Sequence, residues 1–341
     1  MEDQSSLLAL NTLSSLEVIM NNARLLATVA IALCACVTAG CGKARYVMAG
    51  ADEVKLAPGW SSSRLTPHVV LISIDGLRPD AIGTFTTPTL ERLMLEGSFT
   101  LTASTITPSK TLPSHTSMLT GQPPERHGVL WNNVVSADAD IIELPNVFGL
   151  ARSRGYRTAA FFSKAKFQPL QQPGTLDYSQ APGGWFGRWS SARTAADVSK
   201  HLSTARPNLL FVHLSDPDRA GHSSGWMSAA YGRAVTATDS AISQLLTAAD
   251  RSFGKENYTV IVTADHGGHD FDHGSADALD VTIPWIAWGR GVKAGQLQQT
   301  PVQTIDTAST VLWLLGVVEP TDWPGSPVLS AFQASLAADG S

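Results

Sequence analysis

Cysteine is scarce in this chain of 341 residues, which contains three, Cys34, Cys36 and Cys41, all near the N-terminus. If the chain is cleaved before Cys41, one cysteine remains and no disulfide can form within it. Charged residues are also few, at 16% of the sequence, and the formal net charge is -5. This charge argues against a surface that coats nucleic acid. A small anionic substrate stays compatible, because bound metal ions can reverse the local sign of the charge.

Long hydrophobic runs, internal repeats and long runs of charge are lacking as well. The main apolar run, residues 25–37, is too short and alanine-rich for a membrane span and has the pattern of a signal peptide. Ala39-Gly40-Cys41 follows it, as in the cleavage box of bacterial lipoproteins. The residues before Met20 are too acidic for a signal, so Met20 is the expected true start. We expect an exported lipoprotein of the periplasm or cell envelope, anchored in the membrane through lipid on Cys41; a plain signal peptide or an uncleaved anchor is the alternative.

The chain length and a hydrophobic content of 43% suit one globular domain with a sizeable core. We expect a signal segment at residues 1–40, a tether at 41–66, a catalytic domain at 67–318 and a C-terminal tail at 319–341.

Near-continuous apolar runs predict strands that are buried on both faces, at residues 68–74, 158–162, 209–214, 259–263 and 285–288. Helical patterns lie between them, at residues 87–97, where Thr87 is expected to act as the cap, and at 144–154, 229–251 and 305–315. This alternation predicts an α/β layered fold with a mostly parallel central sheet flanked by helices. In such sheets, sites form beyond the carboxyl ends of the strands, and Asp75, Asp218 and Asp265 each follow a strand run.

Residues 163–200 have no clear period and carry several glutamines, prolines and tryptophans. This segment either lines a substrate pocket or is a surface connection with buried tryptophans.

Histidines accompany two of these aspartates. His222 follows Asp218 by four residues, and Pro217 and Gly221 predict a loop there rather than a regular helix. His266 directly follows Asp265, and because neighbouring side chains on a strand diverge, the backbone must turn after them.

One more histidine is needed to complete the set of six metal-ligand-type residues. His273 is the expected ligand, with His269 as the competitor. Their four-residue spacing also occurs in zincin helices, but no Glu follows His269 and glycines flank both histidines. Three aspartates and three histidines can hold two divalent ions; zinc suits this donor set best, while manganese and iron remain open.

Thr111 lies ahead of a short predicted helix, whose first N–H groups can bind an anion. A threonine becomes a nucleophile when a metal or base lowers the pKa of its hydroxyl. Acting only as the helix cap is the alternative. Lys110 beside it either adds positive charge or is simply solvated.

Taken together and in this order, from about Val69 to Gly274, these motifs resemble the nucleotide pyrophosphatase/phosphodiesterase branch of the alkaline phosphatase superfamily. The resemblance implies an alkaline-phosphatase-like fold and hydrolysis of small phosphoesters through a phosphothreonine on Thr111. It implies two zinc sites, one formed by Asp75, Thr111, Asp265 and His266, the other by Asp218, His222 and His273. Asn132, which follows His127-Gly128, would bind a phosphoryl oxygen; Asn133 is the alternative.

The sequence also departs from that family. His273 follows His266 by only seven residues, where the family has a long stretch. Leu112 stands where nucleotide-cleaving members place an aromatic residue, so the substrate need not be a nucleotide. The Cys or Ser nucleophile motif of sulfatases is missing, which argues against a formylglycine sulfatase.

The sequence therefore predicts a metal-dependent phosphoester hydrolase, of phosphodiesterase or nucleotide pyrophosphatase type. A phosphomonoesterase on the same site is the alternative, because such relatives differ by extra cationic groups that grip a dianion, and the sequence does not place such a group. Phosphonoacetate hydrolysis is a third possibility. A ligand-binding surface lipoprotein without catalysis is the alternative from another class. The substrate and the oligomeric state stay open.

Overall fold

The structure is a computed structural model that describes residues 64–133, 141–184, 187–294, 296–297 and 301–333. The expected signal segment, Cys41 and nearly all of the expected tether lie outside the described residues. Of the helices in the described ranges, none combines the length and the hydropathy that a membrane crossing requires.

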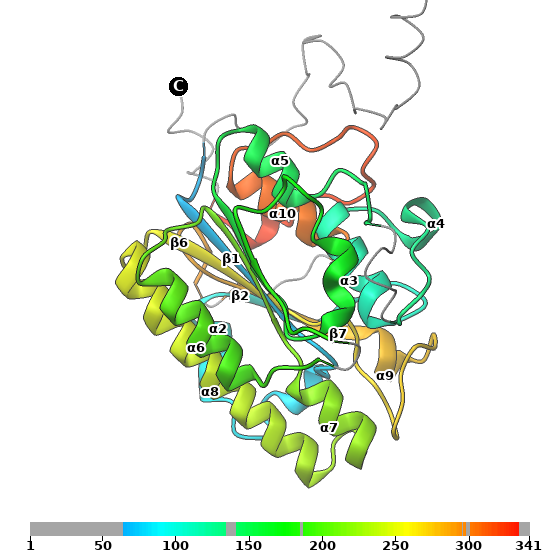
Figure 1. Cartoon of the computed structure of the whole chain (residues 1–341). Coiled ribbons are helices and arrows are strands. Elements are labelled where there is room, and N and C mark those ends of the chain that lie inside the picture. Colours follow the sequence, from blue (N-terminus) through cyan, green and yellow to red (C-terminus); the bar gives the residue numbers. More distant parts are fainter. Residues whose placement is uncertain (1–63, 134–140, 185–186, 295, 298–300, 334–341) are drawn as a thin grey trace, which may run out of the picture. The chain divides into compact units, whose positions relative to one another are not determined.

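The described domain is built around a sheet whose strands follow the order β4-β3-β5-β1-β6-β7-β2-β8 (Figure 1). The strands are β1 (His68–Ile74), β2 (Ser98–Ser104), β3 (Thr158–Phe161), β4 (Tyr178–Gln180), β5 (Leu209–Leu214), β6 (Tyr258–Thr263), β7 (Thr282–Gly289) and β8 (Gln296–Leu297). Strand β7 runs antiparallel to β6 and β2, and the other described pairs are parallel. The predicted mostly parallel sheet is confirmed.

The central strands end at one level of the sheet. Strands β1, β5 and β6 are buried along their whole length, as their β-branched and apolar composition predicts. Ile74 at the end of β1 pairs with Leu214 at the end of β5, and Ser73 pairs with Thr263 at the end of β6. The residues that follow these three strands therefore emerge side by side.

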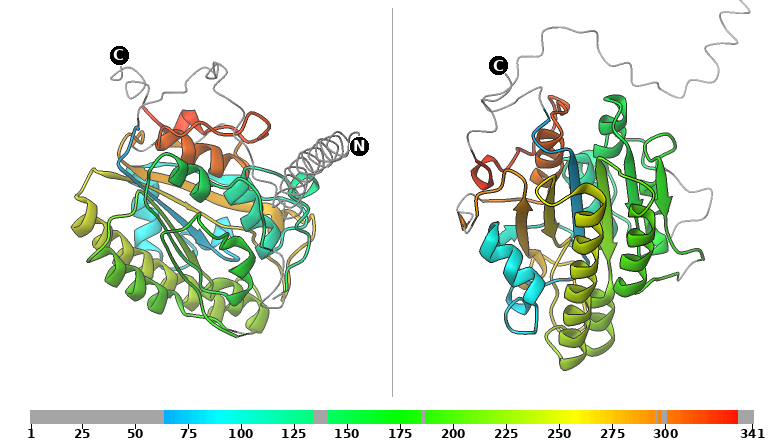
Figure 2. Two further views of the ribbon diagram at one scale, coloured as in Figure 1. Left: turned by 45° about the horizontal axis from the view of Figure 1, so that its top comes forward. Right: turned by 90° about the vertical axis from the view of Figure 1, so that its left-hand side faces the viewer.

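Helices cover both faces of the sheet, with α2, α6 and α8 on one face and α3, α5 and α10 on the other (Figures 1 and 2). The helices are α2 (Pro88–Glu96), α3 (Thr111–Thr120), α4 (Pro124–His127), α5 (Val147–Ser153), α6 (Ser191–Leu202), α7 (Asp216–Ser224), α8 (Ala229–Phe253), α9 (Ala278–Val281) and α10 (Asp306–Leu314). Short 3-10 turns occur at η1 (Pro79–Ala81), η2 (Ala165–Leu170) and η3 (Leu329–Ala331). The stripe of α8 that the sequence predicts, from Val235 to Ala249, is buried.

One local prediction was wrong. Asp218 and His222 lie on a helix, α7, and not in a loop. Pro217 sits in its first turn, where a missing N–H has no cost, and Gly221 makes room for Trp226: a Cβ at Gly221 would lie 2.5 Å from Cδ2 of that ring.

Helix α2 begins where predicted, with Thr87 as the N-cap residue and Pro88 as the first helical residue. The Thr87 side chain, however, makes no cap hydrogen bond and donates to Glu91 instead. The first N–H groups of the helix are capped by Asp239 of α8, whose carboxylate accepts from Thr89 at 3.0 Å and from Leu90 at 2.8 Å. A cap supplied from a residue so far along the chain has no local signal.

Candidate active site

Four neighbouring strands of the sheet each deliver one charged residue just beyond their carboxyl ends. In the order of the strands in space, Lys164 follows β3, Asp218 follows β5, Asp75 follows β1 and Asp265 follows β6. All four are buried. This edge of the sheet is where α/β folds of this kind place their sites.

A first group of metal-type side chains is formed by Asp75, Asp265 and His266, which each direct one ligand atom into a space where these atoms all lie within 4.8 Å of one another. Nε2 of His266 lies 3.3 Å from Oδ1 of Asp75 and 3.3 Å from Oδ2 of Asp265. The Oγ1 atom of Thr111, the first residue of α3, lies 3.4 Å from the same nitrogen. The structure thus brings the predicted nucleophile to three of the predicted ligands.

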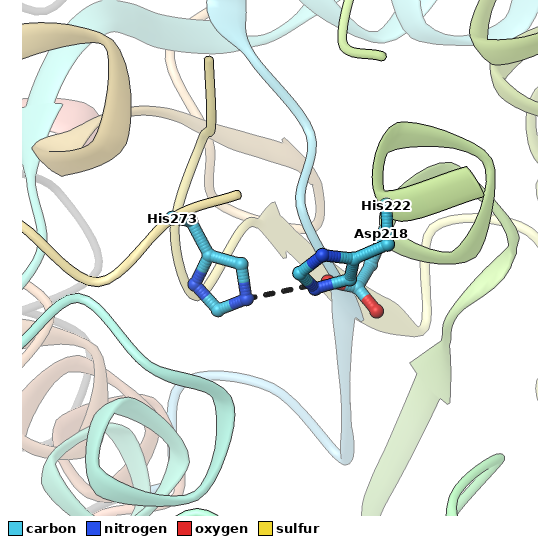
Figure 3. A group of neighbouring side chains, drawn as sticks. All are labelled: Asp218, His222 and His273. Carbon is cyan, nitrogen blue, oxygen red and sulfur yellow. Dashed lines mark ion pairs between the residues drawn. The ribbon is translucent and has the colours of Figure 1, made fainter. Parts of the chain in front are cut away.

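The second group consists of Asp218, His222 and His273 (Figure 3). His222 lies one turn after Asp218 on α7, and its Nε2 is 3.3 Å from Oδ1 of Asp218. His273 approaches the same oxygen from the loop after β6, at 3.6 Å. Figure 3 shows the three side chains gathered around the carboxylate of Asp218.

The loop after β6 separates the two histidines that the sequence left as competitors. His269 Nδ1 lies 2.7 Å from Oδ1 of Asp280, and its side chain is partly exposed. His273 instead stacks on His266, with ring centroids 3.6 Å apart. The structure therefore places His273, and not His269, beside Asp218, and the seven-residue spacing is long enough to do so.

Hydrogen bonds fix which nitrogen each histidine presents. The Nδ1 atoms of His266, His222 and His273 lie 2.8, 2.9 and 2.8 Å from the backbone oxygens of Gly267, Phe271 and Ser109. A carbonyl oxygen only accepts, so each Nδ1 carries the hydrogen. When the ring is neutral, each Nε2 then has a lone pair that faces the carboxylates, as in metal-bound histidines.

Three carboxylate oxygens in these groups are buried without a hydrogen-bond partner, namely Oδ1 of Asp75, Oδ1 of Asp218 and Oδ2 of Asp265. A buried charged oxygen without a partner is costly. A divalent ion between these oxygens and the Nε2 atoms would satisfy them, and a mixed carboxylate and imidazole shell suits zinc and similar ions. The residues present therefore fit two divalent cations.

Without a metal ion, the first group carries more negative than positive charge, and the pKa values of Asp265 and His266 are raised. Burial and the neighbouring Asp75 raise the pKa of Asp265 to about 7. Burial lowers the pKa of His266, but Asp265 and Asp75 outweigh it and raise this pKa to about 9. Because ligand atoms must be deprotonated, metal binding here would release protons.

Lys164 joins the two groups and was missed from the sequence. Its Nζ lies 2.5 Å from Oδ2 of Asp75 and 2.6 Å from Oδ2 of Asp218, whereas the Oδ1 atoms of both carboxylates face the histidines. Burial lowers the pKa of Lys164, but the two carboxylates raise it overall above its usual value. His213 of β5 also contacts Oδ2 of Asp75, at 2.9 Å. The available signal was the position of Lys164, which follows a buried strand as the three aspartates do.

Asn132 lies against the start of α3. Its Oδ1 accepts the backbone N–H of Leu112 at 2.9 Å and a hydrogen from Nζ of Lys166 at 3.3 Å. With its carbonyl oxygen held in this way, its amide NH2 is free to donate to an anion near Thr111. Asn132 makes these contacts, while the neighbouring Asn133 is exposed.

Two surface hollows, of about 530 and 860 Å³, lie elsewhere. Arg206 lines the first hollow, just before β5, and Arg290 lines the second, just after β7. Both residues lie near the amino ends of β5 and β6, away from the carboxyl ends that carry the candidate site. Neither hollow includes a ligand-type cluster found in the described residues. The chemistry of the side chains, and not the size of a hollow, identifies the site.

The sequence matches the type I phosphodiesterase / nucleotide pyrophosphatase family over residues 69–287. The chain belongs to this family. Among its relatives, ectonucleotide pyrophosphatase/phosphodiesterase family member 3 of Mus musculus is 26% identical over 255 residues, which cover 68% of this chain and 28% of the relative. The bis(5'-adenosyl)-triphosphatase enpp4 of Xenopus laevis is 23% identical over 223 residues, 59% of this chain and 47% of its own length. This member of the family thus spans less than half of either relative.

Solved structures share the fold of this phosphodiesterase-family chain. An inactive variant of murine ectonucleotide pyrophosphatase/phosphodiesterase 5 in complex with AMP has a TM-score of 0.67 at 15% identity, covering 78% of this chain and 100% of that one. A 2-O GAG sulfatase has a TM-score of 0.66 at 16% identity, covering 80% and 74%. The predicted family and its alkaline-phosphatase-like fold are confirmed.

Proposed function

We propose that this chain hydrolyses phosphate esters in two steps, with Thr111 as the nucleophile. The observation that carries the proposal is the convergence of Thr111 with Asp75, Asp265 and His266, next to the second group around Asp218. Membership of a phosphodiesterase family supports phosphoester hydrolysis.

In the first step, Oγ1 of Thr111 bonds to phosphorus and the bond from phosphorus to the leaving oxygen breaks. The leaving group departs with the electron pair and is released as an alcohol after it gains a proton. Two divalent ions, zinc by preference, would be held by the two groups and would supply the positive charge that lowers the pKa of the hydroxyl and stabilises the leaving oxygen. The Asn132 amide donates to a non-bridging oxygen as charge develops there.

In the second step, water attacks phosphorus of the phosphothreonine, and the bond to Oγ1 breaks. Thr111 recovers its hydrogen and the phosphate product leaves. The position of Thr111 at the start of α3 keeps Oγ1 in place for both steps, since the helix fixes its backbone.

The test compares Thr111→Ala with a control on the same helix, Thr120→Ala, whose hydroxyl bonds to the backbone of Thr116. We expect the first variant to lose hydrolysis of nitrophenyl phosphate esters while it keeps about two metal ions per chain, which is the number that a paired site holds. The control should stay active. Mass spectrometry of the quenched native enzyme should find phosphate on the peptide that contains Thr111. Full activity of Thr111→Ala would contradict the nucleophile, and a native chain that binds no metal and turns over no ester would indicate a ligand-binding protein.

We also propose that the chain works in the cell envelope with lipid on Cys41, which rests on the sequence around residues 25–41 alone. The mass of the N-terminal peptide from a membrane fraction tests this, and an unmodified Cys41 would contradict it.

A further inference from the structure

Lys166 is the second cation of the segment that follows β3. Its Nζ lies 3.3 Å from Oδ1 of Asn132, and the same oxygen accepts the backbone N–H of Leu112. Leu112 directly follows Thr111. The Lys166 ammonium group therefore lies beside the turn that presents the nucleophile and beside the amide that faces the phosphoryl group.

Two carboxylates balance the charge of Lys164, whereas no carboxylate among the described residues lies within salt-bridge distance of Lys166. Lys166 is half-buried, and burial together with the neighbouring Lys164 lowers its pKa to about 8. A partly buried ammonium group without an anion beside it costs folding free energy, and a bound anion would remove this cost.

We propose that Lys166 binds a terminal oxygen of a phosphoryl group with two negative charges, so that phosphate monoesters are preferred over diesters. This inference rests on the proposed function. A monoester has three non-bridging oxygens, which can be shared among the metal-type groups, the Asn132 amide and Lys166. In a diester, one of these oxygens carries a second organic group and has no charge to offer the ammonium group.

The residue after the nucleophile supports the same choice. The side chain of Leu112 is fully buried, with 0% of its surface exposed. It therefore offers no ring or apolar face beside Thr111 on which a second substituent, such as a nucleobase, could rest.

The contacts of Lys164 help to orient the ammonium group of Lys166. Because Nζ of Lys164 is held by Asp75 and Asp218, the start of the segment is fixed against both metal-type groups. Ala165 separates the two lysines, and η2 begins at this residue. The anchor that orients Lys166 toward Asn132 thus lies two residues earlier along the backbone.

The experiment compares kcat/KM for p-nitrophenyl phosphate and bis-p-nitrophenyl phosphate in the metal-loaded enzyme. The variants are Lys166→Met, Lys166→Arg and a control, Lys200→Met, which removes the same charge from the exposed end of α6. We expect the native enzyme to prefer the monoester. Lys166→Met should lower kcat/KM for the monoester by about 10- to 100-fold, the range for a hydrogen bond to a charged group. Its kcat/KM for the diester should change little, Lys166→Arg should keep most of the preference, and Lys200→Met should match the native enzyme.

Binding of inorganic phosphate gives a second readout that does not depend on turnover. Calorimetry with Thr111→Ala as the background should show phosphate binding weakened about tenfold or more by Lys166→Met. If Lys166→Met does not fold, Lys166→Gln replaces it in both measurements. The ratio of kcat/KM for the monoester to that for the diester in the native enzyme also tests the proposed preference.

Several results would overturn the proposal. An equal loss on both substrates would make Lys166 a residue that only orients Asn132, and a native preference for the diester would exclude the monoester class. If Thr111→Ala is inactive while the native enzyme prefers diesters, only the substrate class fails. If Thr111→Ala stays fully active, the proposed function itself fails.

Discussion

The Nζ atom of Lys164 donates a hydrogen bond of 2.6 Å to Oδ2 of Asp218, from the end of β3 to the first turn of α7. The same ammonium group lies 2.5 Å from Asp75. One oxygen of each carboxylate is thereby neutralised inside the protein, and the other oxygen is buried without a hydrogen-bond partner in its candidate metal-binding group. Lys164 is thus a positioning residue that holds the two ligand groups together.

Replacement of Lys164 by Met should strongly destabilise the metal-free protein, because Asp75 and Asp218 lose their shared counterion while both stay buried. The expected loss is about 3–5 kcal/mol in the free energy of unfolding, as for breaking a buried ion pair. Urea unfolding with EDTA measures it. Lys166→Met is the matched control, since Lys166 has no carboxylate partner in the described residues, and it should change stability far less. Equal losses in the two variants would contradict the positioning role of Lys164.

The two histidines of the loop after β6 should differ in their effect on metal content. His273→Ala removes a side chain directed at Asp218 and should lower the zinc content from about two ions per chain toward one. His269→Ala removes a contact with Asp280 on the exposed side of the loop and should retain the metal. Atomic absorption on dialysed protein checks both. Loss of zinc from His269→Ala alone would reverse the assignment.

Gly76 should not tolerate a side chain, because it lies between the two ligand groups. A Cβ there would be 2.8 Å from the backbone Cα of Asp218, and its φ is +71°. Gly83 has a similar φ of +82° but open space around it. Gly83→Ala should therefore lower the free energy of unfolding only by the strain of a left-handed backbone, about 1–2 kcal/mol. Gly76→Ala should cost more and also lower metal affinity and activity, which thermal unfolding and zinc titration can compare. Equal behaviour of the two variants would show that Asp218 can move aside.

His127 should make stability depend on pH. Its Nδ1 accepts the backbone N–H of Val129 at 3.0 Å, and its Nε2 bonds to Ser117. Burial lowers the pKa of His127 to about 4, against about 6.5 in an unfolded chain. Above pH 6.5 both states are neutral; below it the unfolded state takes up the proton first, so stability falls as the pH drops toward 4. The loss is at most about 3 kcal/mol.

Urea unfolding in EDTA at pH 7.5 and at pH 5 tests this expectation. His127→Gln should show a smaller difference between the two conditions than the native chain. The same difference in both proteins would mean that other groups carry the pH dependence.

Much of the fold could be predicted because its strands are buried on both faces and so read as continuous apolar runs. Strand β1 was predicted with its observed limits, and α8 to within two residues. Strand β2 was missed, since its residues alternate in burial and include threonines and serines that also suit a loop. The helical state of α7 was missed because the packing of Trp226 over Gly221 is not visible in the local sequence.

The convergence of the ligands followed from one rule, that parallel strands end at the same edge of a sheet. Lys164 also lies just beyond the carboxyl end of a parallel strand, β3, but the sequence around it, residues 163–200, has no clear period and, apart from the position of Lys164 after a strand, gives no sign of this role. The contact between Lys166 and Asn132 could not be predicted, because it depends on how η2 packs beside α3. The choice between His269 and His273 also needed the turn in which these residues lie.

One short segment, from Asp265 to His273, contributes to both ligand groups, and the rings of His266 and His273 stack within it. A metal ion bound by either group would restrict the conformations of this segment and so lower the entropic cost of binding a second ion in the other group. The two cations should consequently load cooperatively, and a chelator should strip them as a pair rather than one at a time.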